Sequence, residues 1–93
     1  MQPLLFFGSD ELFALLKKGD VRCQYQIGDL IEKIFVEPGD VLPLGTKGKI
    51  TGNLYIDESF DGIHELYLIK WDTVDVEGFA RQGRIGRRGH KTN

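Results

Sequence analysis

A long β-hairpin pattern between Lys49 and Trp71 dominates this sequence. The apolar stretches ITGNLYI and IHELYLIKW flank the turn ESFDG, whose Asp-Gly pair is typical of a tight reversal. Alternate residues of a strand point to opposite faces, and in the second stretch both faces carry apolar side chains. This pattern favours a strand that is buried on both sides or tightly curved, as in a small barrel.

Short apolar runs separated by Gly, Pro and Asp continue on both sides of the hairpin. They predict five strands, at Val21–Ile27, Leu30–Val36, Gly48–Ile56, Ile63–Trp71 and Val74–Ala80. The 93 residues, 41% hydrophobic and 28% charged, suffice for one small globular domain. We therefore expect a single mostly β domain over residues 1–80.

A short helix is predicted over residues 9–18. Ser9 can cap its first amides, Asp10 and Glu11 suit its positive end, and Lys17 and Lys18 suit its negative end. A helix of this length is marginal by itself, so its apolar stripe must pack on something. It either closes one end of the sheet or barrel, or docks on a partner.

The charges divide the chain into two parts. Five of the 12 basic residues lie in residues 81–93, which hold no acidic residue, so this segment carries +5. The seven basic and 14 acidic residues of positions 1–80 give −7, and the whole chain carries −2. Segment 81–93 is rich in Gly and has one large apolar residue, Ile85, so we expect a flexible basic tail that begins after Ala80.

The loop and hairpin resemble those of SH3-like small barrels. Gly45, Gly48 and Ile50 match a glycine-flanked turn of the form G-x-x-G-x-I/V, and YLIKWD at residues 67–72 matches the following strand. Similar patterns occur in ferredoxin-docking accessory subunits, including the variable chain of ferredoxin–thioredoxin reductase, in the nitrile hydratase β-subunit barrel and in ribosomal KOW-type domains. The resemblance implies a five-stranded SH3-like barrel, here with one short N-terminal α-helix, and a binding role.

Catalytic and metal chemistry finds little support. Cys23 is the single cysteine, so no internal disulfide forms, and a thiol in a half-buried strand is usually structural. An enzyme that uses Cys23 stays an alternative to be tested. His64 and His90 stand in unrelated settings, and the acidic turn at 57–61 lacks the spacing of a calcium loop. We expect no catalytic residue, no metal and no cofactor.

Two sets of residues are candidates for binding. Phe60 lies between acidic residues at the hairpin tip, where it has no obvious core to fill, and Tyr55 and Tyr67 on the neighbouring strands can extend the same surface. These three predict contact with a protein partner. The basic candidates, which suit phosphate groups or an acidic protein, are Lys47, Lys49, Arg81, Arg84, Arg87 and Arg88.

The sequence therefore predicts a non-catalytic protein-interaction module or accessory subunit that uses its barrel loops and tail. The alternative is a KOW-like nucleic-acid-binding accessory protein that uses the Arg-rich tail. The apolar run at residues 4–7 is too short for a signal peptide or a membrane span, so we expect a cytoplasmic protein with no membrane contact. A dimer that forms by pairing of edge strands from two chains stays an alternative.

Overall fold

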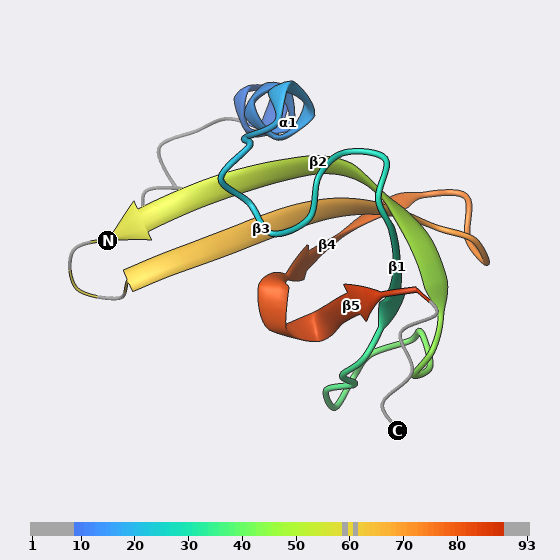
Figure 1. Ribbon diagram of the computed structural model, residues 1–93. Coiled ribbons are helices and arrows are strands. Elements are labelled where there is room, and N and C mark those ends of the chain that lie inside the picture. Colours follow the sequence, from blue (N-terminus) through green and yellow to red (C-terminus); the bar gives the residue numbers. More distant parts are fainter. Residues whose placement is uncertain (1–8, 59, 61, 89–93) are drawn as a thin grey trace.

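The predicted hairpin forms the centre of the sheet, and the other three strands flank it (Figure 1). The computed structural model describes residues 9–58, 60 and 62–88. Its elements are α1 (Ser9–Lys18), β1 (Leu30–Lys33), β2 (Lys47–Glu58), β3 (Gly62–Trp71), β4 (Glu77–Arg81), the 3-10 helix η2 (Gln82–Arg84) and β5 (Ile85–Arg87). Five antiparallel strands in the order β4-β3-β2-β1-β5 confirm the mostly β fold with one short helix. Because no ladder joins β4 to β5 in the described chain, the sheet is open.

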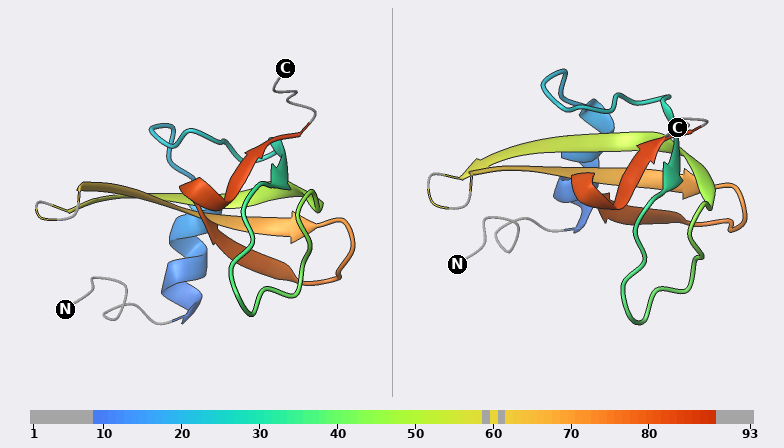
Figure 2. Two further views of the ribbon diagram at one scale, coloured as in Figure 1. Left: turned by 90° about the horizontal axis from the view of Figure 1, so that it is seen from below. Right: turned by 60° about the horizontal axis from the view of Figure 1, so that its bottom comes forward.

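The two faces of the β2–β3 hairpin are covered differently, which explains why both are apolar. The ladder between β2 and β3 shifts register between Ile50 and Gly52, and a bulge of this kind bends a strand. The bent sheet brings β1 and β5 over one face, while α1 lies on the other (Figure 2). The first face holds the core, which consists of Cys23, Tyr25, Ile31, Ile50, Tyr67, Ile69, Trp71 and Ile85.

Helix α1 occupies the predicted residues and packs closely on β2. Leu16 is fully buried. A Cβ atom at Gly52 would lie 2.9 Å from the Leu16 carbonyl oxygen, so only glycine permits this approach. The ion pair between Lys17 Nζ and Glu77 Oε2 (2.7 Å) and the ring contact between Phe13 and Phe79 (5.7 Å between centroids) join the helix to β4. The helix thus packs on the sheet of its own chain, which is the first of the two roles expected for it.

The predicted strand Val21–Ile27 is wrong, because residues 19–29 form turns whose polar groups are bound by side chains. Asn53, fully buried on β2, accepts the Asp20 amide proton at Oδ1 (2.6 Å) and donates from Nδ2 to the Tyr25 carbonyl (2.8 Å). The Tyr25 amide donates to the Tyr67 hydroxyl (3.1 Å). Side chains thus replace the neighbouring strand that a ladder would need.

The C-terminal segment corrects the expected boundary at Ala80. Strand β4 continues through it to Arg81, and β5 pairs with β1 through Ile31 and Arg87, Glu32 and Gly86, and Lys33 and Ile85. Ile85 is 1% exposed in the core. One buried apolar side chain together with a backbone ladder is enough to make residues 81–88 part of the folded domain, although their composition is that of a flexible tail. Residues 89–93 lie outside the described part.

Candidate functional site

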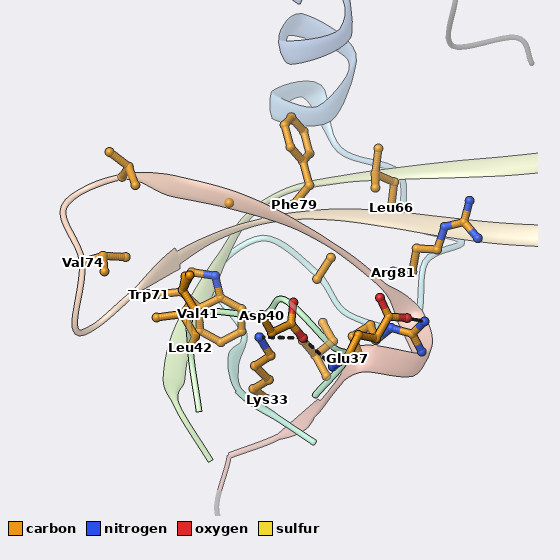
Figure 3. A pocket seen from close by; sticks show the side chains of 15 residues that line it. Lys33, Glu37, Asp40, Val41, Leu42, Leu66, Trp71, Val74, Phe79 and Arg81 are labelled. Atoms are coloured by element: carbon orange, nitrogen blue, oxygen red, sulfur yellow. Dashed lines mark hydrogen bonds and ion pairs between the residues drawn. The ribbon is translucent and has the colours of Figure 1, made fainter. Parts of the chain in front are cut away.

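A groove with a volume of about 590 Å³ runs along the outer edge of β4 (Figure 3). We call it the β4 groove. The loop between β1 and β2 forms its opposite wall. Its apolar lining is Val41, Leu42, Leu66, Trp71, Val74, Val76, Phe79, Ala80 and Ile85. Val41 is 92% exposed and Val76 is 68% exposed, which is unusual for residues of this type beside a hydrophobic core. The groove therefore presents apolar surface to solvent next to an edge strand.

Ion pairs hold the loop that forms the wall of the groove. Lys33, buried on β1, places Nζ 3.2 Å from Asp40 Oδ2, and Asp40 also accepts the Glu37 amide proton (2.7 Å). Glu37 in turn pairs with Arg84, whose guanidinium lies 4.5 Å from the centre of the Phe35 ring. These contacts tie the loop to β1 and η2, so the groove is formed in the free chain.

The three residues predicted to contact a protein partner lie in different environments. Phe60 is 99% exposed at the hairpin tip, so a contact role for it stays a prediction. Tyr55 is half-buried, with the Arg22 guanidinium 4.3 Å from its ring centre. Tyr67 is fully buried in the core, with its ring 5.4 Å from that of Tyr25. Tyr67 is therefore a core residue and not part of a contact surface.

Three of the predicted basic residues already face carboxylates of the same chain. Arg84 pairs with Glu37. Arg87 Nη1 lies 3.7 Å from Asp29 Oδ2, and Arg88 Nη2 lies 3.3 Å from Asp72 Oδ2. Arg88 also donates to the Gly48 carbonyl (2.8 Å). A phosphate group would have to compete with each of these carboxylates. Nucleic-acid binding through this segment stays a prediction.

The remaining three basic candidates are spread over the sheet. Lys47 and Lys49 are exposed on β2, and Arg81 is exposed at the end of β4, with β3 between the two strands. Lys49 stands opposite Lys70 in the β2–β3 register. The structure thus separates Arg81 from the two lysines and places it beside the β4 groove.

Cys23 is buried in the core and is not part of the groove lining. Burial, and next the negative charge of Glu65, raise the pKa of its thiol to about 11. The Tyr67 hydroxyl donates to Glu65, and burial raises the pKa of this tyrosine strongly as well. A thiol that stays protonated at neutral pH is a poor nucleophile. Within the described ranges, no three His, Cys, Asp or Glu residues are grouped so that they can hold a metal ion.

The groove was not predicted, although the sequence contains a signal for it. Val41 and Val76 stand in turn-rich segments between strands, where polar residues are the norm.

In the part of the chain that the structure describes, no helix has the length and apolar character needed to span a membrane. No protein-family model matches this chain, and neither a curated protein nor a solved structure matches it.

Proposed function

We propose that this chain is a non-catalytic protein-interaction module that binds an extended segment of a polypeptide in the β4 groove. One observation carries the proposal: an apolar groove runs along a strand whose outer edge pairs with no other strand among the residues that the structure describes. Such an edge offers backbone hydrogen bonds to an added strand, and pockets beside it select the side chains of that strand.

The order of elements supports the SH3-like barrel as the parent fold. A strand (β1) is followed by an irregular loop that ends at Gly45 and Gly48, then by a hairpin (β2 and β3) and two further strands. The bulge in β2 bends the sheet, as a small barrel needs, although β4 and β5 stay unjoined. In the proposed function, the gap between them is the place where the guest strand binds.

The groove has the mixed lining that gives a peptide both affinity and register. Its floor is apolar around Trp71, whereas Lys33 and Asp40 stand at one wall and Arg81 at one end. Arg84, the ion-pair partner of Glu37, also lines the groove. Apolar side chains of the bound peptide would displace water from the apolar floor of the groove. The charged side chains of the groove would orient the polar side chains of the peptide. An adaptor or accessory subunit needs no more than this.

A peptide selection tests the proposal. We would select random displayed 12-residue peptides on the wild-type chain and measure the binding of the recovered peptides to Val41→Asp. A carboxylate in the apolar groove should weaken binding at least about tenfold. Val21→Asp is the matched control, since Val21 is 89% exposed but is not part of the groove lining, and its affinity should be unchanged.

The outcomes separate the groove from the other surfaces. Peptides that bind Val41→Asp as well as wild type would refute the groove as the site. Loss of binding in Phe60→Ala instead would move the site to the hairpin tip. Displacement of the peptides by plain RNA or DNA, steeply reduced by salt, would favour the nucleic-acid alternative.

A further inference from the structure

Strand β4 is an edge without protection. Its five residues pair with β3 on one side, and none of the loop backbone hydrogen bonds in the described chain reaches residues 77–81. Alternate amide and carbonyl groups of an edge strand point away from the sheet. β4 therefore has free backbone groups along the groove.

The side chains of β4 alternate between charged or aromatic and very small. Glu77, Phe79 and Arg81 share the face that carries α1, as the contacts of Glu77 with Lys17 and of Phe79 with Phe13 show. Gly78 and Ala80 share the core face, opposite Ile69 and Tyr67. Phe79 is 50% exposed, so much of its ring surface has no cover in one copy of the chain.

This sequence is complementary to itself in the antiparallel direction. When two copies of β4 pair about Phe79, Phe79 stands opposite Phe79 of the other copy. Glu77 then stands opposite Arg81, once at each end of the strand. Opposite charges at facing positions stabilise an antiparallel pair, and like charges destabilise it. A two-fold axis generates both ion pairs, as an interface between identical surfaces requires.

We propose that a second copy of this chain binds at the β4 edge and forms a two-fold dimer by antiparallel β4–β4 pairing. The proposal rests on the proposed function, because it names the polypeptide that the groove accepts. The charge pattern selects this occupant: a foreign strand need not carry an acid and a base four residues apart in the matching order. The pairing covers the exposed half of Phe79 and satisfies the free backbone groups.

Charge reversal at the two positions gives a sharp test. Glu77→Arg alone and Arg81→Glu alone each place like charges opposite one another, twice per dimer. Sedimentation equilibrium from about 10 μM to 1 mM should show a dimer for the wild type and a dissociation constant raised about tenfold or more for each variant. An equimolar mixture of the two variants restores opposite charges at both ends. It should form a heterodimer with nearly the wild-type affinity.

Matched controls carry the same charge changes away from this edge. Lys49→Glu and Asp57→Arg are exposed positions on β2, and each should dimerise like the wild type. If Glu77→Arg fails to fold because Lys17 now faces a like charge, Lys17→Glu with Glu77→Arg restores that pair in reverse and takes its place in the mixture.

A wild type that stays monomeric throughout this range overturns the proposal, as does a mixture that fails to recover the dimer. In either case, peptides that still bind the wild type but not Val41→Asp would leave the proposed function standing. If the dimer follows the charges while selected peptides ignore Val41→Asp, the proposed peptide site fails and the charge-dependent dimer remains. A peptide that dissociates the dimer would support both.

Discussion

The two edges of the sheet are built in opposite ways. β5 has three residues, and arginines 84, 87 and 88 surround it, each beside a carboxylate. β4 has five residues, with a half-exposed phenylalanine at its centre and one charge of each sign at its two ends, Glu77 and Arg81. Short strands and charged side chains are devices that prevent edge-to-edge association. This chain therefore protects one edge and leaves the other available for pairing.

The edges also differ in what attaches them to the molecule. β5 is anchored by Ile85, which is buried among the core side chains. The core face of β4 offers only Gly78 and Ala80, so this strand depends on its ladder with β3 and on contacts with α1. The protected edge is thus held by the core, and the available edge by its neighbours.

The largest effect should come from removing the anchor of β5. Ile85→Ala is expected to lower the free energy of unfolding by about 2–5 kcal/mol, because it removes buried methyl groups and leaves a cavity. Phe79→Ala should lower the free energy of unfolding by about 1 kcal/mol, because half of that side chain is already exposed to water. Urea denaturation followed by Trp71 fluorescence measures both. Equal losses would contradict the difference between the edges.

A smaller effect should follow from the loss of the Asn53 side chain. Asn53→Ala leaves the Asp20 amide and the Tyr25 carbonyl without their bonds, at an expected cost of about 1–3 kcal/mol. Residues 19–29 lead directly into β1, which carries β5. Hydrogen exchange should therefore show a greater loss of protection in β5 than in β4. The reverse order would mean that residues 19–29 do not support the β5 edge.

The smallest effect concerns the attachment of β4 to α1 and depends on pH. Hydrogen bonds from Lys17 and then Thr51 lower the pKa of Glu77 below its usual value of 4.5. A pKa that is lower in the folded state contributes stability above the unfolded value, and this is lost as the pH falls through the folded one.

Glu77 is partly exposed, so the contribution is at most about 1 kcal/mol. The fall in stability from pH 6 to pH 3 should be smaller in Glu77→Gln than in the wild type. Asp57→Asn removes an exposed carboxylate outside this ion pair and is the control, with an expected loss of stability between pH 6 and pH 3 equal to that of the wild type. Identical pH profiles for wild type and Glu77→Gln would show that the ion pair with Lys17 adds nothing to the attachment of β4.

Local patterns correctly predicted α1 and the hairpin strands, because each depends on contacts between residues near in sequence. The alternation around Tyr67 also indicated burial on both faces, which the structure confirms. The prediction of Tyr67 as a contact residue was wrong for a related reason. Alternation indicates which residues share a face, but not which face the rest of the chain will cover.

Segments 19–29 and 81–88 show where such patterns end. In the first, Val21–Ile27 has the composition of a strand, but the Asn53 side chain, more than 20 residues away, binds its backbone instead. In the second, a Gly- and Arg-rich composition predicts disorder, but β1 supplies a ladder and the core accepts Ile85. In both cases the competing partner is distant in sequence and is brought close only by folding.

The sequence by itself determined the mostly β class, the short helix, the central hairpin and the uneven distribution of charge. Only the tertiary structure decided that the tail arginines lie beside carboxylates, that the sheet stays open, and that Val41 and Val76 line a groove beside β4. The physical reason is the range of the interactions. Periodicity and turn chemistry act over a few residues, whereas an edge or a groove exists only between segments that the whole fold places together.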